Sequence, residues 1–457
     1  MVDTPQIPDP TLRMSENKRR LLTSLPALLI GLAFGLGKIV RDCSLTCNVG
    51  YQLAPVAIIV IALLSIPVSV LAVRFASRIG YKRWQMWSLG LIALSFFIFW
   101  AAAYSIIGKY PGSADTFVDN GGKLPVRLIY LGFFVWLGAV GTIIAPNIKS
   151  TVYRVFRRTG RMKALALTNA AVICGGLIGG VLANLVVSMA MRNLGLRFEM
   201  ARDLLILSMG IVILSILPVI VIIDKLCCRT FNESSFTHPQ DELHIIYSDL
   251  GKSNFRNAIQ WIISDNRIKR MALIISLRGV SETVLIYLFY WLVAEQTPAV
   301  NGRTLFFADF YILLNAGTLL ILLMGTNRLI DRYGLVFSLI TLPVALFLGS
   351  VYLIFNIAMV VTYVLRIVDT AFEQSFYFQG VDRLLLDVDE SRASYVRPIL
   401  QGLAVRVGRG VGAALILVLA LGIGVSASHM AVFLAAILLI WIAAVISLHR
   451  HKGGISS

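Results

Sequence analysis

Two apolar stretches of the chain contain charged residues whose types and spacing could do chemistry. Arg278 and Glu282 are four residues apart, so on a helix they share a face and can form an ion pair. Arg366, Asp369 and Glu373 occupy successive helical turns of the second stretch. The pattern predicts a polar cavity in which the two arginines bind an anion, while the three carboxylates orient them or serve in coupling and gating.

Charges in hydrocarbon cost about 2.5–3.5 kcal/mol each on insertion scales, so these side chains should face partners or water. A structural network that ties helices together would satisfy the same requirement, and it is the main alternative to an anion site. Arg278 and Arg366 sealed in dry ion pairs would favour the structural network. A water-filled passage beside them would favour the anion site.

Three further charges close the first apolar run of the chain, namely Lys38, Arg41 and Asp42. We expect the two basic residues to contribute to substrate binding and Asp42 to coupling or gating. An interfacial anchor is the alternative, with Lys38 snorkelling into the headgroups. Lys149, which follows the fourth apolar run, is expected either in an inner gate or as a cytoplasmic anchor.

The sequence contains no enzymatic or metal-binding constellation. All five histidines fall in predicted loops or at predicted helix ends, away from any possible nucleophile or second ligand. The glycine-rich segments follow no strand and carry no Lys-Ser or Lys-Thr pair, which excludes a phosphate-binding loop. Cys43 and Cys47 lie one helical turn apart, an arrangement that does not favour a disulfide. We therefore predict no catalytic residues, no metal and no cofactor.

The elements that must position these residues are membrane-spanning helices. Hydrophobic residues make up 58% of the 457 residues and charged residues only 14%, too few to cover a soluble protein. With about 20 residues per span, the apolar runs predict an all-α polytopic membrane protein of twelve helices in two pseudo-symmetric six-helix bundles. The predicted spans are 21–42, 52–74, 84–107, 125–148, 164–190, 203–224, 267–293, 304–326, 335–355, 356–378, 407–427 and 430–449.

These spans divide the chain into five regions: a cytoplasmic tail (1–20), a first bundle (21–224), a linker (225–266), a second bundle (267–449) and a short cytoplasmic tail (450–457). Apolar residues at helical spacing near the end of the linker predict a short amphipathic helix on the membrane surface.

The formal net charge of +17 would suggest nucleic-acid binding in a soluble domain. Here most lysines and arginines fall on the side that the positive-inside rule assigns to the cytoplasm. We therefore expect the cell (inner) membrane, cytoplasmic termini, a monomer in the lipid bilayer and no nucleic-acid partner.

Short motifs recur in the two predicted bundles. Arg78-Ile79-Gly80 follows the second span, and Arg332-Tyr333-Gly334 follows the eighth. Glycine-rich faces, 175–180 and 408–412, fall in the fifth and eleventh spans. Such glycines serve either static close packing or an interface that rocks during alternating access, and the sequence does not choose between these.

Several segments resemble the ATP/ADP antiporter family, nucleotide transporters related to the major facilitator superfamily. Lys38-Ile39-Val40-Arg41-Asp42 is similar to that family's signature at the end of its first helix. Residues 307–315 and 327–334 resemble its eighth helix and the turn that follows. The clearest similarity covers 366–414, although Arg392 and Arg397 stand where many members carry lysines.

The resemblance implies exchange or uptake of a nucleotide, with basic residues holding the phosphates and no hydrolysis. The leading hypothesis is thus a secondary transporter for an anionic solute, most simply a nucleotide. One alternative is a proton-coupled transporter of another anionic metabolite, with Glu282, Asp369 or Glu373 carrying the proton. Another is a membrane scaffold or sensor that no longer transports and binds a partner through its linker.

Overall fold

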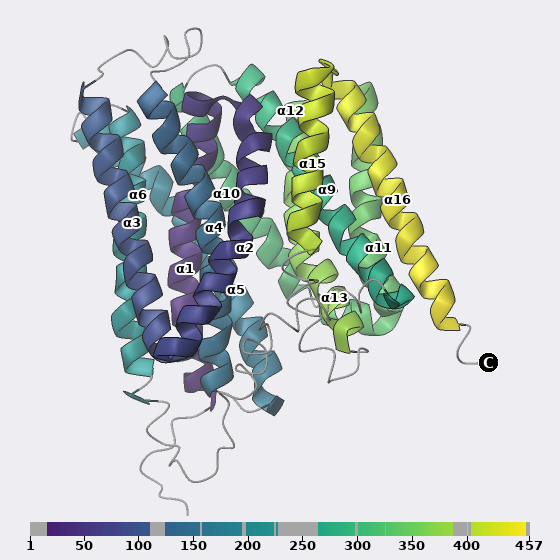
Figure 1. The fold of residues 1–457 in the computed structure, drawn as a ribbon, viewed down its shortest axis with the longest axis horizontal. Helices are drawn as coiled ribbons and strands as arrows, with labels where there is room; N and C mark the ends of the chain where they lie inside the picture. The colour runs from purple at the N-terminus through teal and green to yellow at the C-terminus, as the bar shows by residue number, and fades with distance from the viewer. Residues whose placement is uncertain are drawn as a thin grey trace, which may run out of the picture.

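Helices account for all the regular secondary structure that the computed structural model of this protein describes (Figure 1). The structure describes residues 16–109, 124–155, 158–193, 198–223, 225–226, 264–297, 300–324, 326–386, 400 and 404–453. Eleven of the described helices are long and apolar enough to cross a membrane. The helical run from Met359 to Leu386, whose charges lower its hydropathy, supplies a twelfth element.

Two groups of helices follow each other along the chain. The first half comprises α1 (Glu16–Ser44), α2 (Ala54–Ile79), α3 (Tyr81–Lys109), α4 (Leu124–Val155), α5 (Arg158–Asn193) and α6 (Phe198–Ile223). A π-helical turn, η1 (Leu45–Val49), and a short 3-10 turn, η2 (Tyr51–Leu53), join α1 to α2.

The second half comprises α9 (Asn266–Gln296), α10 (Val300–Leu323), α11 (Thr326–Phe355), α12 (Met359–Phe372), α13 (Phe378–Leu386), α15 (Val405–Ile416) and α16 (Ala427–Gly453). Two π-helical segments continue these helices, η6 (Glu373–Tyr377) between α12 and α13 and η8 (Leu417–Gly422) after α15. Figure 1 shows the two halves side by side, with α2 next to α15.

The hydropathy-based spans agree with the described helices in number and order, and two boundaries need correction. The eleventh span was predicted to reach 427, but the helix ends with η8 at Gly422 and α16 already begins at Ala427. The loop predicted at 327–334 is helical instead, because α11 begins at Thr326 and only Gly334 interrupts it. The predicted linker helix lies outside the described residues.

Glycines let two pairs of helices approach closely, one pair in each half. A Cβ atom on Gly175 of α5 would lie 2.0 Å from the carbonyl oxygen of Leu28 in α1. In the second half, a Cβ atom on Gly408 of α15 would lie 2.1 Å from the carbonyl oxygen of Ser276 in α9. Such distances exclude any side chain, so these glycines serve close packing within each half.

Neighbouring glycines on the same helix face the other half. A Cβ atom on Gly176 of α5 would meet Asn315 of α10 at 2.9 Å, and one on Gly180 would meet Ile312 at 2.7 Å. In α15, Gly410 lies opposite Ala62 of α2. The two readings of the glycine pattern therefore apply to different faces, static packing within a half and a small-residue contact between halves.

The predicted repeat of basic turns has a matching backbone in the two halves. Gly80 ends α2 with φ 83°, and Gly334 interrupts α11 with φ 84°, a region that favours glycine. Both glycines follow the second long helix of their half. The repeated sequence thus encodes a repeated turn.

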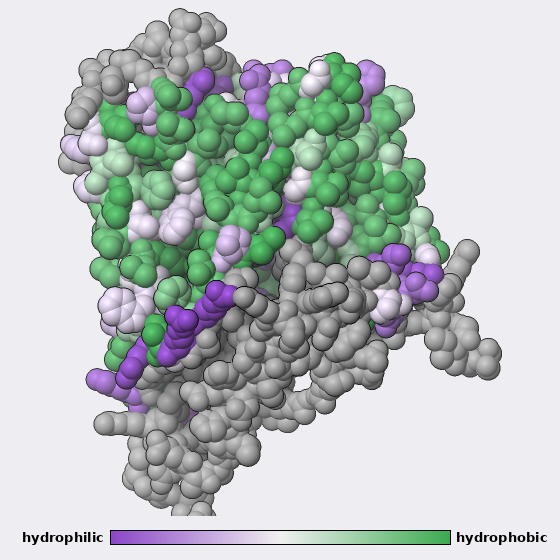
Figure 2. All heavy atoms as spheres, in the orientation of Figure 1, coloured by the Kyte–Doolittle hydropathy of each residue, from purple (hydrophilic) through white to green (hydrophobic). Residues whose placement is uncertain are grey.

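The surface of the bundle is apolar where lipid would cover it. Figure 2 shows a belt of hydrophobic side chains across both halves, with hydrophilic side chains concentrated at its edges. Large exposed side chains include Leu63, Leu94, Leu320, Leu348 and Val360. The protein is a polytopic membrane protein, as its hydropathy predicted.

Candidate functional site

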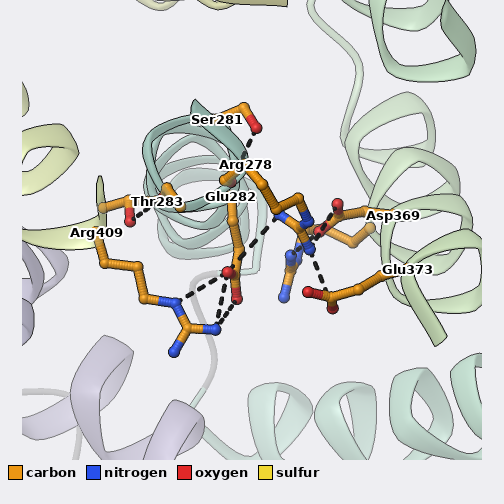
Figure 3. A network of polar contacts seen from close by, with 9 residues as sticks. Arg278, Ser281, Glu282, Thr283, Asp369, Glu373 and Arg409 are labelled. Atoms are coloured by element: carbon orange, nitrogen blue, oxygen red, sulfur yellow. Dashed lines mark hydrogen bonds and ion pairs between the residues drawn. The ribbon is translucent and has the colours of Figure 1, made fainter. Parts of the chain in front are cut away.

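A network of three arginines and three carboxylates joins α9, α12, η6 and α15 (Figure 3). Arg278 of α9 lies at its centre with a side chain that is 1% exposed. Its Nη2 atom is 3.1 Å from Asp369 Oδ1 and 3.0 Å from Glu373 Oε2. The predicted pair within α9 is present but longer, with 3.7 Å between Arg278 Nη1 and Glu282 Oε2.

Two more arginines complete this charge network. Arg366 Nη1 donates to Asp369 Oδ2 at 2.7 Å, one turn along the same helix. Arg409 of α15 binds both oxygens of Glu282, with Nε and Nη2 each 2.9 Å from one of them. Glu282 therefore lies between two arginines, one buried and one accessible.

Local helix geometry explains how one arginine reaches two carboxylates of a neighbouring helix. Asp369 and Glu373 are four residues apart, and the chain passes from α12 into the π-helical segment η6 at Glu373. Residues four apart share a face of a helix, which directs both carboxylates at Arg278 of α9. Single π-helical turns occur frequently at functional sites.

Accessible positive charge remains inside the bundle at Lys38. Its side chain is exposed, and its ammonium lies against the buried Tyr311 ring of α10, so the exposure faces the interior rather than lipid. The Lys38 ammonium lies 5.9 Å from the centre of the Tyr311 ring. Among the described residues no carboxylate forms an ion pair with it, although Asp42 and Glu373 lie within electrostatic range.

Asp42, next on this stretch of α1, connects the two halves. Its carboxylate is buried and accepts hydrogen bonds from three donors. Arg41 Nε of the same helix donates to Oδ1 at 2.6 Å, and Tyr290 of α9 donates to the same oxygen at 2.8 Å. Tyr311 of α10 donates to Oδ2. We call these residues, Asp42 with Tyr290 and Tyr311, the Asp42 closure.

Other contacts seal the same end of the molecule. Arg303 of α10 is buried and donates to the carbonyl oxygens of Thr46 in η1 at 2.6 Å and of Ala294 in α9 at 2.8 Å. Cys43 Sγ lies 2.7 Å from Thr304 Oγ1, and the Tyr51 and Trp291 rings stack with 6.4 Å between centroids. Polar and aromatic contacts of α1 and its η1–η2 connection with α9 and α10 thus close this end.

In the described part of each seam between the halves, a charge faces neutral groups. At the α2–α15 seam, Arg406 Nη1 donates to Ser65 O and to Ser69 Oγ, both at 3.3 Å. At the α5–α10 seam, Asn184 Nδ2 donates to Asp309 Oδ1 at 3.1 Å. Within the described part of the chain, neither Arg406 nor Asp309 forms an ion pair.

The predicted site residues differ in how far their side chains are exposed and in how many carboxylates contact them. Arg278 is enclosed by carboxylates, as the structural alternative required, whereas Arg366 is 14% exposed and has one carboxylate partner among the described residues. Arg41 is occupied by Asp42 and by the face of Phe134, 5.1 Å from its ring centre. Lys149 falls in α4, and its side chain lies outside what the structure describes.

Sequence reasoning missed several residues that complete these contacts. Arg409 lies near the start of its predicted span, and its ion-pair partner, Glu282, is on another helix, α9. Tyr290 and Tyr311 were given no site role, although Tyr311 lies in the segment 307–315 that resembles the antiporter family. Arg202, predicted to flank a span, is instead fully buried with Asp203, Tyr130 and Asn48, an arrangement that anchors α6 to α4 and η1.

A separate pocket of about 320 Å³ lies among α11, α13 and α16 and shares no residue with the charge network. Its lining is apolar apart from the Tyr333 hydroxyl. None of the described residues that line it is charged.

Comparison with known proteins gives the fold. Neither the protein-family models nor the curated proteins gave a match. The structure is similar to the xylose transporter XylE from E. coli in a partially occluded inward-open conformation, with a TM-score of 0.60 and 15% identity over 95% of this chain and 98% of that one.

Two other solved structures are similar over nearly the whole chain. An inward-facing bacterial homolog of the human lysosomal transporter Spinster has a TM-score of 0.58 at 13% identity, covering 96% of this chain and 98% of that one. The human organic anion transporter MFSD10 has a TM-score of 0.56 at 14% identity, covering 94% and 100%. Another XylE structure is described as a major facilitator superfamily protein. The chain therefore has the major-facilitator fold, in agreement with the architecture predicted from its sequence.

Proposed function

We propose that this protein is a secondary transporter that moves a small anionic solute across the membrane by alternating access. The fold supports this proposal, because two halves of this architecture rock about a site between them. The observation that carries it is Lys38, whose charged side chain is exposed inside the bundle and has no ion-pair partner among the described residues. An anionic cargo would supply that partner.

The state of the molecule fits this mechanism. The Asp42 closure and Arg303 seal the end at which α1 joins α2, which the sequence assigns to the outside. The cargo site would then open to the cytoplasm. Binding from that side, followed by loss of the closure, would release cargo on the other side.

A nucleotide is the favoured cargo because of the motifs shared with the ATP/ADP antiporter family. Lys38, Arg41 and Asp42 carry that resemblance, and Lys38 and Arg366 are the predicted binding residues with accessible side chains and incomplete charge compensation. The similar organic anion transporter is compatible with an anionic cargo of another kind. The resemblance thus supports nucleotides and the charges support anions in general.

Proton coupling is the second candidate, and Glu373 favours it. Among the described residues, this carboxylate has one ion-pair partner, Arg278, and is 16% exposed, whereas Asp369 has two arginine partners and is 1% exposed. A carboxylate with fewer cationic partners takes up a proton at lower cost. Protonation of Glu373 would then accompany movement of the anion.

Proteoliposomes containing the purified protein test both candidates. Uptake of labelled ATP, ADP, NAD and a panel of small organic anions is measured with and without a pH gradient, and with and without unlabelled solute inside. Exchange that requires internal nucleotide supports the first candidate, and uptake driven by the gradient supports the second. Absence of uptake for every anion would overturn the transport proposal and favour a scaffold or sensor.

A further inference from the structure

Arg409 stands out among the residues that the sequence did not assign to any site. Its side chain is 42% exposed although it lies within a membrane span of α15. Val407 and Val411, two residues away on either side, are exposed. Two residues correspond to about 200° around an α-helix, so Arg409 projects from the opposite face, where its guanidinium meets Glu282 of α9 inside the bundle.

The guanidinium of Arg409 is only partly used. Nε and Nη2 bind Glu282, and Nη1 makes no hydrogen bond to any described residue. Its planar edge can bind a carboxylate or a phosphate through two parallel hydrogen bonds. Glu282 now occupies the position that such an anion would take.

A second arginine can receive Glu282 if it leaves Arg409. Arg278 Nη1 is buried and makes no hydrogen bond in the described structure, and it lies 3.7 Å from Glu282 Oε2. Figure 3 shows the Glu282 carboxylate between the two guanidinium groups. A small rotation of the glutamate side chain would therefore lengthen one ion pair and shorten the other.

We infer that Arg409 is a cargo-binding residue and that Glu282 is its intramolecular competitor. An anionic group of the cargo replaces Glu282 on Arg409, and Glu282 turns to Arg278. The charge network contains three arginines and three carboxylates, so it is neutral without cargo, and Lys38 offsets the first negative charge that arrives. This inference rests on the proposed anionic cargo and names the residue that first meets it.

Competition makes a directional prediction that a structural ion pair does not. Glu282→Gln removes the competing charge but preserves the shape of the side chain, so anions should bind more tightly to Arg409. Arg409→Gln should weaken binding about tenfold or more, because a bidentate charged contact is lost. Arg409→Lys keeps the charge but loses the planar edge, so its affinity for anions should lie between those of the wild type and of Arg409→Gln.

The experiment measures thermal stabilisation of the purified full-length protein by ADP, citrate and inorganic phosphate, each titrated separately. Ligands that bind only the folded protein raise its stability by mass action, which yields an apparent affinity. Arg332→Gln is the matched control, since Arg332 is exposed and contacts Tyr333 outside the charge network. It should leave every affinity unchanged.

Tighter anion binding by Glu282→Gln, together with loss in Arg409→Gln, supports the inference. Wild-type affinity in Arg409→Lys and Arg409→Gln would overturn it while leaving transport proposals intact. Equal or weaker binding by a folded Glu282→Gln would overturn the competition. If Glu282→Gln does not fold, Glu282→Asp, which keeps the charge but shortens the side chain, tests the competition: tighter anion binding supports it, and equal or weaker binding overturns it. A wild-type protein that no probe stabilises and that transports no anion would overturn this inference and the proposed function together.

Discussion

Asp42 holds three donors on one buried carboxylate, and two of them come from the other half of the molecule. Hydrogen bonds to charged groups contribute about 1.5–3 kcal/mol each. Loss of this one acceptor would thus weaken the contact between α1 and both α9 and α10. It would also leave the Arg41 guanidinium without its ion-pair partner.

Asp42→Ala should therefore open the sealed end more often. Cys43 and Cys47, both buried beside Asp42, report this directly once the other cysteines are replaced by serine. We expect their labelling by a membrane-impermeant maleimide to accelerate roughly tenfold or more, the factor that a loss of about 1.4 kcal/mol produces. Tyr290→Phe with Tyr311→Phe should act in the same direction. Unchanged labelling in both variants would argue against the Asp42 closure.

Arg278 and Arg366 should respond differently to neutralisation. Arg278→Gln leaves Asp369 and Glu373 facing each other without their shared cation, so it should destabilise the protein by about 3–5 kcal/mol, as loss of one partner of a buried ion pair does. Arg366→Gln should be milder because its side chain is partly accessible. Thermal unfolding in detergent compares them, and a larger effect of Arg366→Gln would contradict this ranking.

The glycines of α5 and α15 face either a helix of the same half or a helix of the other half, and we expect the first kind to affect stability and the second to affect transport rate. Gly408→Ala places a methyl group against the Ser276 carbonyl, and overpacking of this kind costs about 1–3 kcal/mol. Gly180→Ala meets mainly the flexible Ile312 side chain across the seam. We expect Gly408→Ala to lower the melting temperature and Gly180→Ala to alter transport rate more than stability. Equal losses of stability would show that both faces serve static packing.

Hydropathy predicted the helices well because each span needs about 20 apolar residues whatever its neighbours are. The two corrected boundaries lie where glycine and irregular helix, rather than polarity, end the element. Spacing within one helix also predicted the Arg278–Glu282 pair, and it placed Arg366 and Asp369 on one stripe without predicting that they pair. Contacts between helices could not be predicted from the sequence, because a pair such as Arg409–Glu282 depends on how α15 is rotated against α9.

At the scale of the whole molecule, one end is closed by contacts between segments that are distant in sequence. Thr304→Cys in a Cys47→Ser background places a thiol where Oγ1 now lies 2.7 Å from Cys43 Sγ. An oxidant should form the Cys43 disulfide, which would fix α1 to α10 and abolish transport until a reductant restores it. Thr304→Ser in the same background is the control. Full transport by oxidised protein that mass spectrometry shows to be cross-linked would contradict alternating access through this end.

The two seams have a consequence for the energy of motion. Arg406 faces Ser65 and Ser69, one turn apart on α2, and Asp309 faces Asn184, with Ser188 one turn further along α5. In the alternating access proposed above, each of these charges would pass from one neutral partner to the next, and among the described residues no ion pair between the halves would be separated along these seams. Such contacts would oppose sliding less than ion pairs do, because separating opposite charges in a medium of low dielectric constant is costly.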